Sequence, residues 1–148
     1  MAREGTRKFK NDETQNSVLY GLSITGGNGT IGGLNDLEFN GQRKGGGIWI
    51  FQSSPTISNC HVFGNIVIPT PNDPSYGGGI GMYGGTWDWG INGPVTYNWQ
   101  PIIDRCKVFD NAADVGGGIY MYDGIDPIIK NCIIENNVAT NEWVGGGL

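Results

Sequence analysis

Acidic and basic side chains gather in two neighbouring segments, and acid–base chemistry is the first function to consider for them. The group comprises Asp104, Arg105, Lys107, Asp110, Asp123, Asp126 and Lys130. Carboxylates can act as general acid, general base or nucleophile, and a basic residue can abstract a proton. The group contains no adjacent pair of aspartates, and we expect Asp104 to form an ordinary ion pair with Lys130. We therefore predict no catalytic residue. Asp123 and Asp126 would be the ligands if Ca²⁺ were bound, but we expect no cofactor.

Metal or redox chemistry at cysteine is the second function to consider. The three cysteines, Cys60, Cys106 and Cys132, form no CxxC pair, and His61 is the only histidine. These residues therefore do not match the ligand spacing of a zinc site. A redox or metal site is the functional interpretation of the three thiols. We favour the alternative that they are small buried side chains, as free cysteine commonly is, and we predict no metal.

Aromatic side chains are concentrated in residues 84–100, and this segment is the candidate ligand-binding loop. The candidates are Trp87, Trp89, Tyr97 and Trp99. Sugar C–H faces pack on aromatic rings, and polar neighbours in the loop would take the hydroxyl groups. The alternative, which we favour, is a β-hairpin with its turn at residues 91–94 that packs its rings on the outer wall or on a neighbouring subunit. A second insertion, residues 31–44, is polar and glycine-rich and suggests no chemistry.

The composition excludes several classes of protein. The chain has 148 residues, 27 of them glycine, and it contains 17 Ile and 8 Val against 5 Leu and 4 Ala. This bias disfavours a helical bundle, because branched side chains lose rotamer freedom on a helix. The net charge of −5 argues against a nucleic-acid partner, which needs a basic surface. We also expect no membrane span, since no apolar run approaches about 20 residues, and residues 1–16 lack the apolar segment of a signal peptide.

An internal repeat must position all of these residues. Three glycines followed by Ile or Leu occur four times, at residues 45–48, 77–80, 116–119 and 145–148. A second string occupies residues 55–65, 101–111 and 127–137 without gaps, with proline first, cysteine five residues on and asparagine ten residues on. Residues 17–27 form a weaker copy. Such regular self-similarity is typical of solenoids, in which stacked repeats bury one continuous core.

Stacking would convert equivalent positions of the repeat into ladders along the solenoid axis. The apolar residues alternate with period two, which predicts short strands separated by turns. Ile57, Ile103 and Ile129 would form one apolar ladder, and Val62, Val108 and Ile134 another. The cysteines would form a third ladder inside the solenoid. A ladder of amides at a turn is expected from Asn65, Asn111 and Asn137.

The repeat resembles the right-handed parallel β-helix of pectin-lyase-like proteins. It is most similar to the repeats of polymorphic outer-membrane proteins, which carry GGAI-like and FxxN-like strings; here residues 45–48 read GGGI and residues 63–65 read FGN. The resemblance implies an all-β fold, a right-handed parallel β-helix (solenoid) of about four coils with inserted loops. We expect a single domain over residues 1–148, with a lead-in at residues 1–16 and insertions at residues 31–44 and 84–100. It also implies an extracellular or cell-surface location.

The two ends of the repeat array suggest a role in assembly. The last string starts a further coil, whereas the first copy is preceded by residues 7–16 and lacks a Gly-Gly-Gly strand. Either the chain is part of a longer β-helix, or one molecule stacks head-to-tail on the next, a contact that produces filaments. The candidate residues of that interface are Phe9, Leu19, Leu22, Gly145, Gly146, Gly147 and Leu148.

The sequence thus predicts a non-catalytic, extracellular structural or adhesive β-helix module that self-associates through its open coil ends into a longer solenoid or filament. The expected partner is a second copy of the chain, with a polysaccharide as a further candidate. Two alternatives stay open. One is a carbohydrate-binding module, and the other is a polysaccharide lyase or glycoside hydrolase, because the pectin-lyase-like proteins that the repeat resembles include such enzymes.

Overall fold

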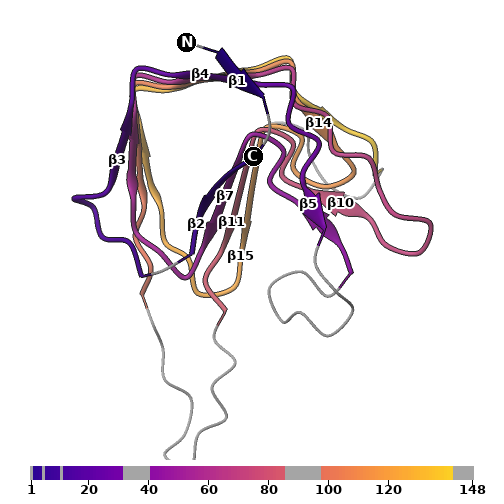
Figure 1. The fold of residues 1–148 in the computed structure, drawn as a ribbon, viewed down its shortest axis with the longest axis horizontal. Helices are drawn as coiled ribbons and strands as arrows, with labels where there is room; N and C mark the ends of the chain where they lie inside the picture. The colour runs from indigo at the N-terminus through magenta and orange to yellow at the C-terminus, as the bar shows by residue number, and fades with distance from the viewer. Residues whose placement is uncertain (1, 5, 11, 32–40, 86–97, 142–148) are drawn as a thin grey trace, which may run out of the picture.

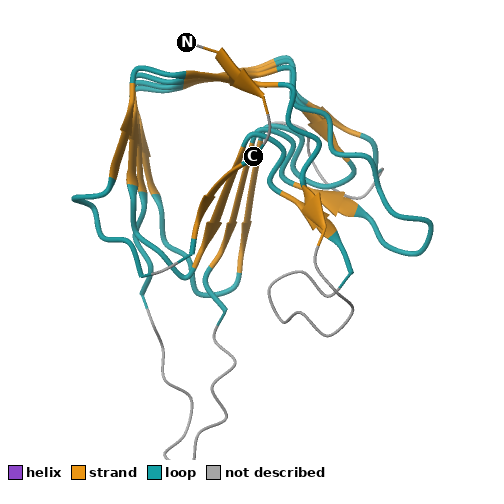
Figure 2. Cartoon of the chain, viewed as in Figure 1, coloured by secondary structure: helices purple, strands orange, loops and turns teal. Residues whose placement is uncertain are grey.

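The chain winds around one axis as a stack of similar coils, which overlap when the molecule is viewed along that axis (Figure 1). The structure is a computed structural model that describes residues 2–4, 6–10, 12–31, 41–85 and 98–141. Figure 2 shows strands and loops in these residues, and none of them forms a helix. Within this part of the chain there is accordingly no helix long and apolar enough to cross a membrane.

Three parallel sheets form the walls of the coil. Sheet A has the order β1 (Ala2–Glu4), β4 (Ser23–Thr25), β9 (His61–Phe63), β13 (Lys107–Phe109), β17 (Ile133–Glu135). Sheet B runs β2 (Arg7–Phe9), β7 (Ile48–Phe51), β11 (Ile80–Tyr83), β15 (Ile119–Tyr122). Sheet C runs β3 (Val18–Tyr20), β8 (Thr56–Ser58), β12 (Ile102–Asp104), β16 (Ile128–Lys130). Each coil contributes one strand to each wall, which confirms the predicted parallel β-helix.

A side lobe lies beside the walls, at the right of Figure 1. It contains β5 (Thr30–Ile31), β6 (Arg43–Lys44) and β10 (Ser75–Tyr76), in the sheet order β10-β6-β5. β5 and β6 pair antiparallel, whereas β6 and β10 pair parallel. A two-stranded parallel sheet adds β14 (Ala112–Ala113) and β18 (Val138–Ala139). The lobe therefore flanks the outer side of sheet B.

The core consists of the predicted apolar ladders. Ile57 pairs in register with Leu19 and Ile103, and Ile103 pairs with Ile129. The two middle rungs are fully buried, and the outer rungs are half-buried. Burial of each of the two middle isoleucines contributes roughly 1.5–3 kcal/mol, so the stacked rungs stabilise the coil.

Sharp corners separate sheet C from sheet A. The corner residues Asn59, Arg105 and Asn131 have φ values of 52°, 50° and 55°, in the left-handed region. Gly21 has a φ of 68° at the equivalent corner of the first coil. A single left-handed residue therefore turns the chain at each of these corners and leaves the following residue, cysteine in three coils, facing inward.

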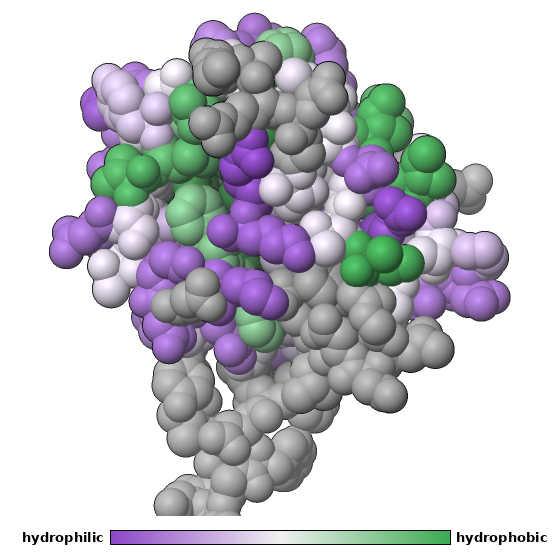
Figure 3. Space-filling view, viewed as in Figure 1, coloured by the Kyte–Doolittle hydropathy of each residue, from purple (hydrophilic) through white to green (hydrophobic). Residues whose placement is uncertain are grey.

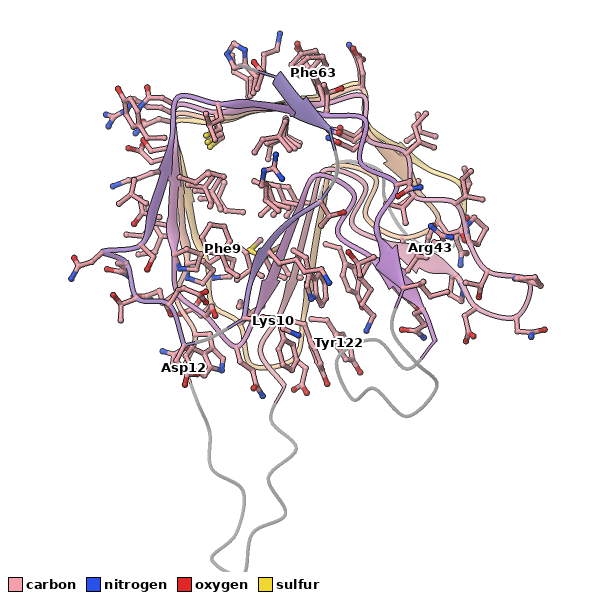
Figure 4. All side chains as sticks on the ribbon, in the orientation of Figure 1. Phe9, Lys10, Asp12, Arg43, Phe63 and Tyr122 are labelled. Carbon is pink, nitrogen blue, oxygen red and sulfur yellow. The ribbon has the colours of Figure 1, made fainter. Side chains whose placement is uncertain are left out.

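The first coil corrects one prediction from the sequence. Arg7–Phe9 pairs in register with Ile48, Trp49 and Ile50 and so takes the place of the Gly-Gly-Gly strand that the first copy was expected to lack. Strand pairing uses backbone groups and does not need the glycines. Phe9 packs against the core cluster in the position that Ile50 holds in the next coil (Figure 4).

Candidate functional site

The outer face of sheet B carries two columns of aromatic residues. Successive side chains of a strand point to opposite faces, so Ile48 and Ile50 face the core and Trp49 and Phe51 face outward. The register aligns Trp49 with Gly81 and Tyr120 in one column. It aligns Phe51 with Tyr83 and Tyr122 in the other.

The rings of these columns contact one another and extend onto the side lobe. The ring centroids of Phe51 and Tyr83 are 5.6 Å apart, and those of Tyr83 and Tyr122 are 5.7 Å apart. Tyr120 lies 6.2 Å from Tyr122 and 4.9 Å from Tyr76 of the lobe. We call this surface the aromatic face; its residues are Trp49, Phe51, Tyr76, Tyr83, Tyr120 and Tyr122.

Gly81 makes room for the largest ring of the aromatic face. A Cβ atom at this position would lie 2.7 Å from Cε3 of Trp49, so the indole lies directly over the glycine backbone. Trp49 is fully buried, whereas Tyr122 is 57% exposed. The aromatic face is therefore tightly packed at Trp49, and its most accessible ring, Tyr122, lies on β15.

Positive charge accompanies the rings. Nζ of Lys44 lies 5.7 Å from the Trp49 ring, 5.8 Å from the Tyr76 ring and 5.3 Å from the Tyr83 ring. Lys8 pairs in register with Trp49 and so stands in the same outward column. Lys10 directly follows the end of β2, two residues after Lys8, and is exposed (Figure 4). A ligand on the aromatic face would thus meet ammonium groups next to flat rings.

Tyr76 and Tyr120 keep their hydroxyl protons on this surface. Burial raises the pKa of Tyr120 and of Tyr76, and nearby ionisable groups raise both further. Both phenols are therefore neutral near pH 7 and can donate hydrogen bonds as well as accept them. Rings, neutral hydroxyls and ammonium groups together can bind a polyhydroxylated molecule that carries carboxylates.

The predicted aromatic loop is only partly described by the structure. Trp87, Trp89 and Tyr97 lie outside the described residues. Trp99 is half-buried and forms a parallel bridge with Ile125, which places it at the corner between sheets B and C. Trp99 therefore follows the wall of the coil.

The predicted assembly residues are also described in part. Gly145, Gly146, Gly147 and Leu148 lie outside the described residues. Phe9, Leu19 and Leu22 are half-buried and pack against the core at the N-terminal end. At the other end, Met121 is 39% exposed, although Ile50 and Met82 in the same inward column are fully buried. Core positions are thus accessible at the last described coil.

The charged residues considered for catalysis make contacts within the walls of the coil. Asp104 is 7% exposed; its Oδ2 lies 2.9 Å from Nη2 of Arg105, and its Oδ1 accepts a hydrogen bond from Nδ2 of Asn131 at 2.9 Å. The predicted ion pair of Asp104 with Lys130 is therefore wrong, although the two residues pair in register. The corner turn at Arg105 brings its guanidinium back to Asp104. Lys107, another member, pairs with Glu135 at 2.7 Å.

The asparagine ladder is confirmed. Nδ2 of Asn65 donates to Oδ1 of Asn111 at 2.8 Å, and Nδ2 of Asn111 donates to Oδ1 of Asn137 at 2.9 Å. The backbone N–H groups of Asn65 and Asn111 donate to the same oxygens. The second hydrogen of Nδ2 of Asn111 goes to the Val62 carbonyl at 2.9 Å. This ladder holds neighbouring coils together through hydrogen bonds from each coil to the next.

The cysteine ladder is confirmed as well. All three thiols are free; Cys60 and Cys106 are buried and Cys132 is half-buried. Each thiol donates to the carbonyl two residues before it, at 3.3 Å for Cys60, 3.4 Å for Cys106 and 3.2 Å for Cys132. Within the described part of the chain, no group of three or more His, Cys, Asp or Glu residues could hold a metal ion.

Stacked parallel sheets, corner residues in the left-handed region and an internal amide ladder together define the architecture. The family model of the right-handed β-helix region matches residues 1–147. The chain belongs to the right-handed β-helix family. Comparison with curated proteins and with solved structures found no match.

In this β-helix, the sequence interpretation missed the aromatic face. The ring platform predicted from the sequence lies in residues 84–100, and the strands were expected to supply the core. A signal was present: the residues after the glycine triplets read IWIF, IGMY and IYMY, and their second and fourth positions are the outward ones. Aromatic residues at outward positions of stacked strands indicate a surface column. The alternation has to be compared across the three copies, because the column forms only where they stack in register.

Proposed function

We propose that this right-handed β-helix is a non-catalytic, extracellular adhesive module that binds an acidic polysaccharide along the aromatic face. The observation that carries this proposal is the contiguous column Phe51–Tyr83–Tyr122, with Lys44 over the adjoining rings. Rings offer packing surfaces for sugar C–H groups, and phenol hydroxyls and ammonium groups suit hydroxyl and carboxylate groups of a uronic-acid chain. Neighbouring strands are about 4.8 Å apart, so the column offers contacts at regular spacing.

The charged residues of the walls support a role without catalysis. General acid–base catalysis needs a carboxyl or basic group in reach of the substrate. Asp104 ends β12 and is held by Arg105 and Asn131 at the corner between sheets C and A. Asp110 and Asp123 have φ values of 53° and 47° and so occupy turn positions. These carboxylates shape the coil, and the aromatic face itself consists of aromatic rings with Lys44 beside them.

A retention assay on immobilised polysaccharides tests the binding. Tyr122→Ala should lower retention on acidic polysaccharides about tenfold, which corresponds to ~1.4 kcal/mol, because it removes the most exposed ring of the aromatic face. The matched control is Phe63→Ala on the outer face of sheet A, where Phe63 stacks on Phe109 at 5.0 Å. That variant should bind like the wild type. Equal retention of Tyr122→Ala and wild type on every polysaccharide would reject the aromatic face as the site.

Salt separates acidic from neutral ligands in the same assay. Retention on a uronic-acid polymer should fall steeply as the ionic strength rises, since exposed charges are screened. Lys8→Gln combined with Lys10→Gln should weaken retention at low salt and have little effect at high salt. Salt-independent retention would indicate a neutral polysaccharide.

Self-association is a second candidate function, favoured by the exposure of core positions in the last described coil. Met121 extends the inward column of Ile50 and Met82 but is 39% exposed. Edge strands with unpaired backbone groups are templates for pairing with another chain. Figure 3, viewed along the axis, also shows hydrophobic residues exposed at the end of the coil that faces the viewer. We propose that copies stack head-to-tail through these coil ends.

Sedimentation over a dilution series tests this second proposal. The wild type should grow in size with concentration, and Met121→Lys should remain monomeric, because a charge in the shared column opposes stacking. Ile68→Lys is the control, since Ile68 is 64% exposed outside the three walls. A wild type that stays monomeric at all concentrations, or a Met121→Lys variant that assembles normally, would contradict head-to-tail stacking.

A further inference from the structure

The walls of the coil end unevenly at the N-terminal end of the stack. Sheet A has five described strands and ends in β1, whereas sheets B and C have four each and end in β2 and β3. Figure 1 shows β1 over β4 on the side that faces the viewer. Ile24 of β4 is 1% exposed, while Phe9 of β2 and Leu19 of β3 are half-buried. Sheet A is therefore covered by one strand more than its neighbours.

The inward columns of sheets B and C would continue without a break from one copy of the chain into the next. Phe9 shares its column with Met121, through the register of β2, β7, β11 and β15. Leu19 shares its column with Ile129 in sheet C. All four side chains are apolar, and none of them is fully buried. A second copy whose β2 and β3 follow β15 and β16 would bury each of them against its counterpart.

The outward columns of sheet C are complementary in the same register. Val18 stands in the column of Ile128, and both are exposed, at 58% and 39%. Tyr20 stands in the column of Lys130, and both side chains are exposed as well. Contact between copies would cover the two aliphatic side chains and place an ammonium group beside an aromatic ring, which is an attractive pair.

Sheet A fits this stacking only when β1 is absent from β4. The same register would place β17 directly on β4, with Ile134 following Ile24 in the inward column. β1 already occupies that place, and it keeps a second copy about 4.8 Å further away, the spacing of one strand. At that separation the strands of sheets B and C cannot form backbone hydrogen bonds between copies. Arg3 of β1 also stands at a register position that is Ile or Val in the other coils.

We propose that a second copy stacks through the pairs β15–β2, β16–β3 and β17–β4, and that β1 is an autoinhibitory strand that leaves β4 before the copies join. Oγ1 of Thr6 donates to the carbonyls of Gly45 and Gly46, both at 3.0 Å, and so anchors the chain directly before β2. β1 can therefore leave while β2 stays in place. This inference rests on the head-to-tail stacking proposed above and adds its register and its control.

Deletion of residues 2–4, followed by sedimentation over a dilution series, tests the role of β1. The deletion leaves the formal net charge at −5, because Arg3 and Glu4 cancel. The shortened chain should assemble at a concentration about tenfold lower than the wild type, since separation of β1 from β4 no longer opposes association. Met121→Lys in the shortened chain is the control and should remain monomeric, which excludes non-specific aggregation.

Arg3→Ile is the converse variant and keeps the whole chain. It gives β1 the residue type of the inward column, which should strengthen the pairing of β1 with β4. Assembly should therefore require a higher concentration than in the wild type. Assembly at a lower concentration would show that β1 extends the stack instead of blocking it, and would overturn the proposal.

Disulfide cross-linking tests the register between copies. In the shortened chain, a mixture of Val18→Cys and Ile128→Cys molecules should form cross-linked dimers under mild oxidation, because strands about 4.8 Å apart are within the reach of a disulfide. Each variant alone should form none. A mixture without dimers would overturn the register. If the wild type and the shortened chain both stay monomeric, head-to-tail stacking itself fails; if the wild type assembles and the deletion brings no gain, only the role of β1 is overturned.

Discussion

Asn111 shows at the scale of one residue how the coils are held in register. Its Oδ1 accepts from both the side chain and the backbone N–H of Asn65, and its Nδ2 donates to Val62 and Asn137. The side chain is fully buried. Because buried polar groups cost free energy when they lack partners, the amide must match both neighbouring coils, and a shift of one residue would leave every rung unsatisfied.

Asn111→Ala should therefore destabilise the protein by roughly 2–6 kcal/mol, because two buried groups lose their partners at about 1–3 kcal/mol each. Asn137→Ala, at the half-buried last rung, should cost less. Urea unfolding of both variants against the wild type measures the difference. An Asn111→Ala cost no larger than that of Asn137→Ala would show that the ladder does not stabilise the stack.

Tyr120 makes a pH prediction at the same scale. Burial raises its pKa above the ordinary value of 10.0. Above about pH 10 the unfolded chain loses the phenol proton while the folded protein keeps it, so the free energy of unfolding falls as the pH rises. Tyr120→Phe should flatten this alkaline loss and leave the stability near pH 7 less affected. Urea unfolding midpoints of the wild type and Tyr120→Phe at neutral and alkaline pH measure the difference. An equal loss of stability at alkaline pH in both proteins would contradict the raised pKa of Tyr120.

The glycine triplets act at the scale of the element, where strands of neighbouring coils approach closely. A Cβ at Gly78 would lie 2.3 Å from the Gly117 carbonyl oxygen and 2.7 Å from the Ala112 oxygen. These are backbone atoms of the next coil, which cannot move without shifting the stack. The triplet is therefore needed for contact between coils as well as for the turn.

Gly78→Ala should lower stability more than Gly21→Ala. Gly21 has a φ of +68° with nothing within 4 Å of its Cβ position, so alanine there meets backbone strain alone, about 1–2 kcal/mol. Thermal unfolding monitored by circular dichroism compares the two variants. Equal melting temperatures would mean that the coils can separate at Gly78 at little cost.

Most strands could be predicted from the sequence, since β7, β11 and β15 follow identical triplets and β8, β12 and β16 follow prolines. β2 could not, because Arg7–Phe9 shares only its inward Phe9 with the repeat and is recruited by backbone pairing to β7. The lobe strands β5 and β6 also escaped prediction, because two-residue strands carry no period.

At the scale of the whole molecule, the sequence predicts the interior of the stack better than it predicts the surface. Inward ladders and the amide column could be predicted, because the repeat itself specifies them. The aromatic face could not be predicted from a single copy, because it exists only where Phe51, Tyr83 and Tyr122 come into register on neighbouring coils. Lys44 reaches the Tyr83 ring from the side lobe; it stands 32 positions before Tyr76 in the sequence and beside it in the sheet. The binding surface of such a fold therefore depends on which outward side chains neighbouring coils bring into register.

The central claim is that the β-helix binds an acidic polysaccharide without cleaving it. One incubation tests both halves: retention of the polymer is measured, and the chain length of the recovered polymer is then determined by size-exclusion chromatography. We predict retention that Tyr122→Ala weakens, with the polymer recovered at its original length. Shortened chains would show an enzyme, and a polymer that is not retained at all would contradict the aromatic face as a binding surface.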